Sequence, residues 1–171
     1  MGYDISDYQN IHEPYGSVAD VEQLARQLHD RDMKLMLDLV VNHSSDEHEW
    51  FIQSRSSKSN PKRDWYHWRP ASYDHDGKRR PPNNWKTSLG GGSVWEWDEG
   101  TEEYYLHLYD IKQPGQCSLH TLCSHHTRLI RIDLNFENPD VRAAIYEMMH
   151  FWVKLGCDGF RVSYPQPPSD I

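Results

Sequence analysis

One segment decides the fold, and it reads Met33-Lys34-Leu35-Met36-Leu37-Asp38-Leu39-Val40-Val41. It is almost continuously apolar, and a strand of this kind is typical of a parallel sheet that helices cover on both faces. Apolar residues at helical spacing precede it and predict a helix over residues 18–30. Ser17 and Asp20 resemble a capping box at the start of that helix. A helix followed by a buried strand is one repeating unit of an α/β fold, in which helices and parallel strands alternate along the chain.

The same order of elements returns near the end of the chain. Asn138 followed by Pro139 predicts a helix start, and Gly156 predicts its end. The residues between them carry an apolar stripe at helical spacing, and a short strand, residues 159–162, follows. Two helix–strand units in succession predict an α/β fold with parallel strands.

The residues between the two units have another character. Six of the seven Trp fall within residues 50–97, among Pro, Gly and charged residues, and residues 104–109 are typical of a strand. A connection of about ninety residues is far longer than a loop. We therefore expect an irregular, aromatic-rich domain inserted after the first strand.

Composition excludes several classes of protein. The chain has 171 residues and a net charge of −8, which argues against nucleic-acid binding because phosphates demand clustered Lys and Arg. It is shorter than the roughly 200 residues that a complete (β/α)₈ barrel needs. No apolar run suits a membrane span and no secretory signal is present, so we expect no membrane association. Three cysteines without framework spacing favour free thiols and a cytoplasmic location.

Polar side chains stand where the predicted strands end. Asp38, Asn42 and His43 lie at the carboxyl end of the first strand, the edge at which parallel α/β sheets bind ligands. The alternative is that Asp38 and Asn42 only hydrogen-bond the strand end. Arg161 in the second strand requires a carboxylate partner, since a buried unpaired guanidinium is very costly.

These residues also carry a family resemblance. Residues 38–48, Asp-Leu-Val-Val-Asn-His-Ser-Ser-Asp-Glu-His, resemble the first signature of the α-amylase family, glycoside hydrolase family 13. Gly159-Phe160-Arg161-Val162 resembles the start of its second signature. Three further motifs resemble the branch of α-glucosidase, maltase, isomaltase and oligo-1,6-glucosidase: Gly2-Tyr3-Asp4-Ile5-Ser6-Asp7-Tyr8, Gln113-Pro114 and Asp133-Leu134-Asn135.

The resemblance implies a partial (β/α)₈ TIM barrel, built around its strands 3 and 4, with an inserted irregular α+β B domain. Residues 1–43 would supply the loop after strand 2, helix 2 and strand 3, and residues 139–162 helix 3 and strand 4. The B domain would occupy residues 44–138 and include an atypical insertion at 115–132. Residues 163–171 form a tail that departs from the family pattern.

The resemblance also implies site residues. Tyr3 would stack on the terminal glucose, His43 would hydrogen-bond its hydroxyls and Gln113 would line the pocket. Arg161 would orient the nucleophile of a retaining glycosidase, in which two carboxyl groups lie about 5–5.5 Å apart. The implied partner is a small α-glucoside or oligosaccharide, with no cofactor and no metal. The preference for α-1,4 or α-1,6 linkages and the oligomeric state stay open.

This sequence departs from the family pattern at the positions of the catalytic carboxylates. Ser163 occupies the position of the nucleophilic Asp, and a serine hydroxyl does not replace a carboxylate beside an oxocarbenium-like centre. The other two catalytic carboxylates of the family have no counterpart among these residues. We therefore expect an inactive fragment of an α-glucosidase. The alternative is a non-catalytic remnant that binds carbohydrate or a partner.

Residues 115–132 form the second departure from the pattern. These 18 residues contain no acidic group, and deleting them restores a Gln-Pro-Asp-Leu-Asn run. One interpretation is a zinc site made of Cys117, His120, Cys123 and either His125 or His126, although the spacing fits no standard pattern. We favour the hypothesis that this segment, like the tail 163–171, is a translated intron, which the sequence of a spliced transcript would test.

Overall fold

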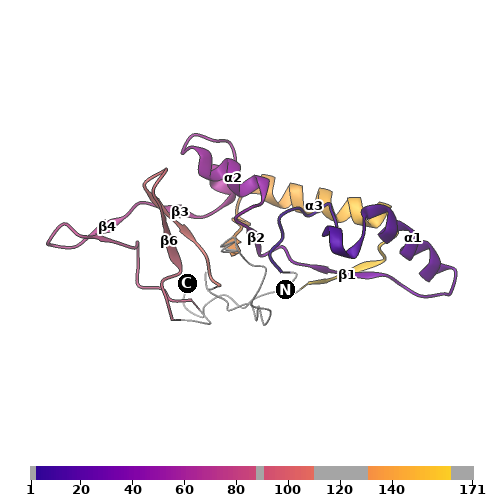
Figure 1. Ribbon diagram of the computed structural model, residues 1–171. Helices are drawn as coiled ribbons and strands as arrows, with labels where there is room; N and C mark the ends of the chain where they lie inside the picture. Colours follow the sequence, from indigo (N-terminus) through magenta and orange to yellow (C-terminus); the bar gives the residue numbers. More distant parts are fainter. Residues whose placement is uncertain (1–2, 88–90, 110–130, 163–171) are drawn as a thin grey trace. The chain divides into compact units, whose positions relative to one another are not determined.

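The computed structural model describes residues 3–87, 91–109 and 131–162. Those residues belong to two compact units, which are described separately. The first unit comprises Met1–Ser6 and His43–Asn138, and the second comprises Asp7–Asn42 and Pro139–Ile171. Figure 1 labels several elements of each unit.

The second unit contains the two predicted helix–strand pairs. Helix α1 spans Val18–His29 and strand β1 spans Met36–Leu39, while helix α3 spans Pro139–Lys154 and strand β9 spans Gly159–Val162 (Figure 1). A short 3-10 turn, Glu13–Tyr15, precedes α1. Strands β1 and β9 pair in parallel, with Asp38 opposite Arg161. The predicted helices, the second strand and the parallel pairing are confirmed.

Local signals explain where α1 begins and where α3 ends. Ser17 and Asp20 form the predicted capping box: the Ser17 backbone N–H donates to Asp20 Oδ2 at 2.7 Å, and the Asp20 N–H donates to Ser17 Oγ at 3.4 Å. Gly156 follows α3 with a φ of +103°, a value that favours glycine. A Cβ atom at Gly156 would lie 2.9 Å from the Cβ of Ala25 in α1. The small residue therefore permits close packing between α1 and the end of α3.

Asp158 ties the turn after α3 to the segment before β1. Its carboxylate accepts hydrogen bonds from His29 Nε2 at 2.7 Å, Lys34 Nζ at 2.9 Å and the Leu35 N–H at 2.9 Å. The hydrogen bond from His29 is the largest cause of a strongly lowered pKa of Asp158, followed by those from Leu35 and Lys34. The ionised form of Asp158 is thus part of the folded second unit.

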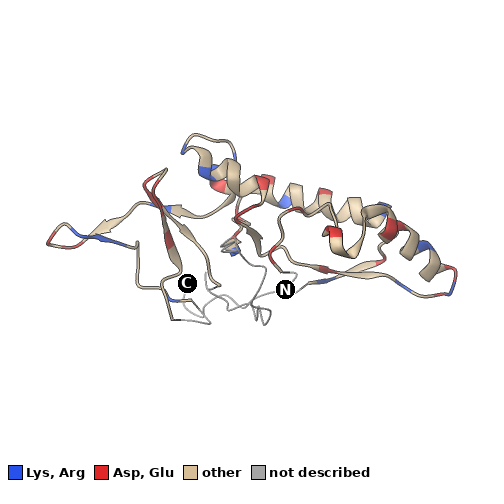
Figure 2. Ribbon diagram, in the orientation of Figure 1, with Lys and Arg blue, Asp and Glu red and all other residues tan. Residues whose placement is uncertain are grey.

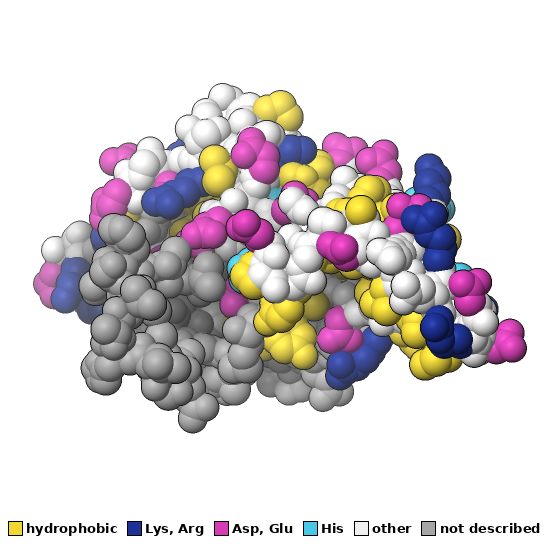
Figure 3. All heavy atoms as spheres, turned by 45° about the vertical axis from the view of Figure 1, so that its right-hand side comes forward, with side chains coloured by type: hydrophobic (Ala, Val, Ile, Leu, Met, Phe, Trp, Pro, Cys, Tyr) yellow, Lys and Arg dark blue, Asp and Glu magenta, His cyan; other side chains and the backbone are white. Residues whose placement is uncertain are grey.

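The expectation that the first strand is buried on both faces is wrong. The strand is also shorter than its apolar run, and Met36 at its start is 63% exposed. Among the described residues, β1 has a single strand neighbour, β9. Hydrophobic side chains reach the surface among acidic and basic ones on the face that Figure 3 shows. Burial depends on what packs against a strand, and that information lies outside the strand's own sequence.

The first unit is rich in short antiparallel strands. Its one helix among the described residues, α2, spans Glu49–Ser56, and a 3-10 turn spans Arg63–Trp65. The strands are β2 (His43–Ser45), β3 (Trp68–Arg69), β4 (Ser72–Tyr73), β5 (Arg79–Arg80), β6 (Trp95–Asp98), β7 (Glu103–Leu106) and β8 (Arg131–Asp133). The pairings are β2 with β8, β4 with β5, and a sheet in the order β3-β7-β6.

Aromatic rings form much of the interior of the first unit. Phe51 in α2 is 1% exposed, and its ring lies 5.1 Å from Tyr66, 5.2 Å from Tyr105 and 5.9 Å from Trp68, centroid to centroid. Such contacts add to the hydrophobic gain from burying each ring. Three of the tryptophans between residues 50 and 97, namely Trp65, Trp68 and Trp95, are buried. These three therefore act as core residues.

Candidate functional site

His43 stands at the start of β2, directly after the loop that follows β1. Strand β2 pairs antiparallel with β8, which places His43 opposite Asp133. The His43 side chain is buried, and its Nε2 lies 2.9 Å from the carbonyl oxygen of Tyr3. Because a carbonyl only accepts, Nε2 carries the hydrogen and donates it. Burial lowers the pKa of His43, and the hydrogen bond to Tyr3 opposes part of that effect.

Two tyrosines and an arginine lie around His43. The Tyr109 ring centroid is 5.4 Å from that of His43. The guanidinium carbon of Arg131 lies 5.6 Å from the Tyr109 ring centroid and 5.9 Å from the Tyr3 ring centroid, within the range of cation–π attraction. Arg131 Nε donates to Asp4 Oδ1 at 2.6 Å, and both side chains are largely buried. We call Tyr3, Asp4, His43, Tyr109 and Arg131 the tyrosine–arginine cluster.

Strand β8 holds one side of the tyrosine–arginine cluster. Ile132 is fully buried, and the carboxylate of Asp133 accepts a hydrogen bond from the Leu108 N–H at 2.7 Å. Burial raises the pKa of Tyr109, and the neighbouring Asp133 carboxylate adds to the rise. The cluster thus brings flat rings together with the guanidinium of Arg131, a combination that suits the apolar faces and hydroxyls of a sugar.

Sequence reasoning missed Arg131, Asp4 and Tyr109 as members of this cluster. Arg131 and Ile132 are the last two residues of the segment 115–132 that departs from the family pattern, yet the structure places both in β8. The alternation of polar and apolar residues in Arg131-Ile132-Asp133-Leu134 is a period-two signal for a strand that would have included Arg131.

Arg161 and Asp38 meet in the second unit. Arg161 Nη1 lies 3.1 Å from Asp38 Oδ1 and 3.2 Å from Asp38 Oδ2, across the parallel pair β1–β9. The prediction that Arg161 has a carboxylate partner is confirmed. The side chains are 67% and 36% exposed, so the pair itself stabilises the fold by no more than about 1 kcal/mol. The contact holds the Arg161 guanidinium against Asp38 near the carboxyl ends of the two strands.

The remaining predicted positions are placed as follows. Tyr3 and His43 contact each other in the first unit, and Asn42 ends the second unit's first segment immediately before His43. Gln113 and Ser163 lie outside the described residues, as do the zinc candidates Cys117, His120, Cys123, His125 and His126. Over the ranges 3–87, 91–109 and 131–162, no group of three metal-ligating side chains comes together. Nor does any helix in those ranges have the length and apolar character to cross a bilayer.

Comparison with known protein families gives a match over nearly the whole chain. A family model described as the catalytic domain of α-amylase matches residues 1–164. The chain is 52% identical over 162 residues to an α-glucosidase of Schizosaccharomyces pombe and 49% identical over 163 residues to an α-glucosidase of Candida albicans. It is 51% identical over 161 residues to an oligo-1,6-glucosidase of Parageobacillus thermoglucosidasius. These alignments cover 94–95% of this chain and 24–25% of the relatives, so the chain spans about a quarter of their length.

Solved structures give the same result. A trehalose-6-phosphate hydrolase of Bacillus licheniformis superimposes with a TM-score of 0.77 at 45% identity, over 94% of this chain and 25% of the other. The isomaltulose synthase of Protaminobacter rubrum superimposes with a TM-score of 0.77 at 40% identity, over 95% of this chain and 25% of the other. The described residues therefore share the fold of the corresponding part of these enzymes.

Proposed function

This chain belongs to the α-amylase catalytic-domain family, and from that premise we propose that it descends from an α-glucosidase of the retaining type. The substrate class is terminal α-linked glucose in oligosaccharides of the maltose or isomaltose type. The observation that carries this proposal is the identity of 49–52% to α-glucosidases and an oligo-1,6-glucosidase. The family model matches residues 1–164, a range that includes Tyr3, His43 and Arg161. Three cysteines without framework spacing support a cytoplasmic location.

The finer architecture is part of the same proposal. Strands β1 and β9 correspond to strands 3 and 4 of a (β/α)₈ barrel, and residues 44–138 form its inserted B domain. The parallel register of β1 and β9, with helix α3 leading into β9, supports this assignment because βαβ units build such barrels.

The proposed chemistry stops short of hydrolysis. In a retaining glycosidase a carboxylate attacks the anomeric carbon and a second carboxyl group protonates the leaving oxygen. Arg161, held by Asp38, is the residue that would orient the nucleophile, but Ser163 stands two positions later, where the family places an Asp. A serine hydroxyl is a much weaker nucleophile than a carboxylate unless a base activates it. We therefore assign this chain no glycosidase activity of its own.

A sugar-binding role is the second candidate function, and the tyrosine–arginine cluster favours it. Tyr3 is 38% exposed, so part of its ring is open to a ligand. His43 donates its Nε2 hydrogen to the Tyr3 carbonyl and so fixes the backbone that carries this ring, and Arg131 supplies N–H groups beside the same ring. These features support stacking of a glucose face on Tyr3, with Gln113 as a further proposed contact.

Hydrolysis of p-nitrophenyl α-glucoside, maltose and isomaltose by the purified full-length chain tests the first proposal. The expected rate equals that of buffer. The matched control is Arg26→Ala, because Arg26 carries the same charge on an exposed face of a helix. Turnover that disappears in Arg161→Ala but persists in Arg26→Ala would show that the chain is an active glycosidase and overturn the proposal.

Methyl α-glucoside titrations followed by tryptophan fluorescence test the second candidate. Saturable quenching is expected, and Tyr3→Ala should abolish it. Tyr15→Ala is the matched control, because Tyr15 is 85% exposed and lies away from the tyrosine–arginine cluster in sequence and unit. Equal quenching by both variants, or none by the unmodified chain, would exclude a sugar site at Tyr3.

A further inference from the structure

The first unit contains two stretches of adjacent basic residues, and their surroundings differ. They are Lys62-Arg63 and Lys78-Arg79-Arg80, and the rest of the chain has no neighbouring pair of Lys or Arg residues. Endoproteases that recognise two successive basic side chains cut after such pairs, and they hold the residues around the cut as an extended strand. A pair is therefore cleavable only where its side chains are accessible and its backbone is extended or easily opened.

Arg63 is buried and held through its guanidinium. The guanidinium donates hydrogen bonds to the Ser54 carbonyl oxygen at 3.0 Å and to Thr101 Oγ1 at 3.2 Å. It also donates to Glu103 Oε2 at 2.6 Å and lies 3.4 Å from the centroid of the Trp68 ring. The side chain is 8% exposed, and the backbone begins a 3-10 turn. A protease would have to break all of these contacts, so the fold protects this pair.

The second stretch lies on the β4–β5 hairpin, and its three residues are exposed. Lys78 follows the turn, and Arg79 and Arg80 form β5, whose basic residues Figure 2 shows along one strand of the hairpin. Among the described residues, β5 pairs with β4 alone, over two residue pairs. A two-stranded hairpin of this length is marginally stable, so it opens at low cost. The backbone of β5 is also already extended, as a protease requires.

The contacts of Arg79 and Arg80 are those of an exposed surface. Arg79 Nη2 lies 3.6 Å from Glu99 Oε1, and the two side chains are 41% and 80% exposed. The Arg79 guanidinium carbon also lies 4.0 Å from the centroid of the Trp97 ring. Arg80 Nε donates to Asp74 Oδ2 at 3.0 Å, and the Arg80 side chain is 56% exposed. Exposed pairs of this kind are weak, so these contacts do not protect the stretch as burial protects Arg63.

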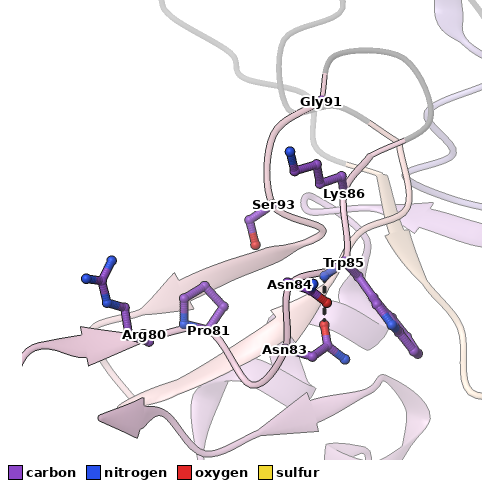
Figure 4. Close-up of a pocket in the computed structure, with 8 residues that line it drawn as sticks. All are labelled: Arg80, Pro81, Asn83, Asn84, Trp85, Lys86, Gly91 and Ser93. Atoms are coloured by element: carbon purple, nitrogen blue, oxygen red, sulfur yellow. Dashed lines mark hydrogen bonds between the residues drawn. The ribbon is translucent and has the colours of Figure 1, made fainter. Parts of the chain in front are cut away.

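We propose that the peptide bond between Arg79 and Arg80 is a site of specific cleavage by an endoprotease that recognises paired basic residues. Arg79 enters the protease pocket for the residue before the cut, and Lys78 enters the pocket next to it. Water adds across the peptide bond and its C–N bond breaks, which leaves a carboxylate on Arg79 and an ammonium group on Arg80. The bond after Arg80 is excluded, because Pro81 has no N–H and its ring crowds that bond (Figure 4 shows Arg80 and Pro81).

Strand pairing joins the chain on the two sides of this bond. Strands β1, β2 and β3 precede it, and their partners β9, β8 and β7 follow it. The two products should therefore stay associated under native conditions and separate in urea. Products that separate on native gel filtration would overturn this part of the inference.

Digestion of the full-length chain with an endoprotease that cleaves after Lys-Arg pairs tests the site, with the products identified by mass spectrometry. The control for sequence preference is a pair of synthetic peptides, residues 58–68 and residues 74–84, which contain the two Lys-Arg pairs without the fold. The rate of cleavage after Arg79 relative to that after Arg63 should be at least about tenfold higher in the folded chain than in the peptides. Losing one hydrogen bond to a charged group corresponds to a factor of about this size.

Variants assign the cut to the hairpin. Arg79→Gln should abolish it, whereas Arg69→Gln, with the same change of charge at an exposed position in β3, should leave its rate unchanged. A ratio of rates in the folded chain equal to that in the peptides would overturn the proposal. So would no cleavage after Arg79, a cut that persists in Arg79→Gln, or equal effects of the two variants.

Discussion

The ion pair between Arg131 and Asp4 makes a strong prediction about the first unit. Replacing Arg131 with Gln removes the charge that Asp4 Oδ1 contacts at 2.6 Å. The two side chains are 13% and 14% exposed, so water cannot readily replace the lost partner. The Asp4 carboxylate would remain almost buried and uncompensated, and the cation beside the rings of Tyr3 and Tyr109 would be lost.

The expected size of the effect follows from the burial of the pair. Removing one partner of a fully buried ion pair costs about 3–5 kcal/mol, and a hydrogen bond to a charged group contributes about 1.5–3 kcal/mol. Because both side chains keep some exposure, we expect a loss of about 2–3 kcal/mol in the free energy of unfolding of the first unit. With a urea dependence of about 1–3 kcal/mol/M, the unfolding midpoint should fall by about 1 M.

Tryptophan fluorescence during urea unfolding measures this loss. Six of the seven Trp lie between residues 50 and 97, all in the first unit, so the signal reports mainly on that unit. The matched control is Arg26→Gln, which breaks an exposed pair with Glu22 at 3.2 Å and should cost less than about 0.5 kcal/mol.

A double-mutant cycle with Asp4→Asn isolates the pair. The two single changes should be non-additive by at least about 1 kcal/mol, because each removes the same interaction. A midpoint of Arg131→Gln equal to that of the unmodified chain, or additive effects in the cycle, would refute the reasoning. It would also show that Arg131 is not part of the folded strand β8.

Three further predictions concern packing, backbone and pH. Phe51→Ala should lower the free energy of unfolding of the first unit by about 3–5 kcal/mol, measured by urea unfolding, while Ile52→Ala, at a site 50% exposed, should change it far less. Gly156→Ala should lower the thermal midpoint of the helical circular dichroism signal, because the left-handed φ and the 2.9 Å approach to Ala25 both oppose a Cβ atom. A melting temperature unchanged by that substitution would contradict the packing described. The pKa of Asp158 is lowered in the folded state, so its stabilising effect is complete above the unfolded value of about 3.9 and is lost as pH falls below it. Urea midpoints followed by circular dichroism should therefore drop steeply below about pH 4, and Asp158→Asn should remove part of that dependence.

Helices α1 and α3 and the strands that follow them could be predicted because their signals are local, whereas α2 was not predicted. The capping box of Ser17 and Asp20, the apolar stripe of α3 and the left-handed Gly156 act within one or two turns of chain. The carboxylate partner of Arg161 could also be predicted, and the parallel register explains it because it places Asp38 opposite Arg161. The burial assumed for Arg161 was wrong, since its side chain is 67% exposed.

The sequence by itself determined the family, the two helix–strand pairs α1–β1 and α3–β9, and the absence of a carboxylate at Ser163, because these signals lie in short stretches of consecutive residues. Only the tertiary structure decided which side chains share an environment. It left Met36 exposed at the start of an apolar strand and joined Arg131 to Asp4 across 127 positions. It also stacked the ring of Trp85 on that of Trp95. Burial and pairing over such separations depend on what packs against each residue, and no local pattern carries that information.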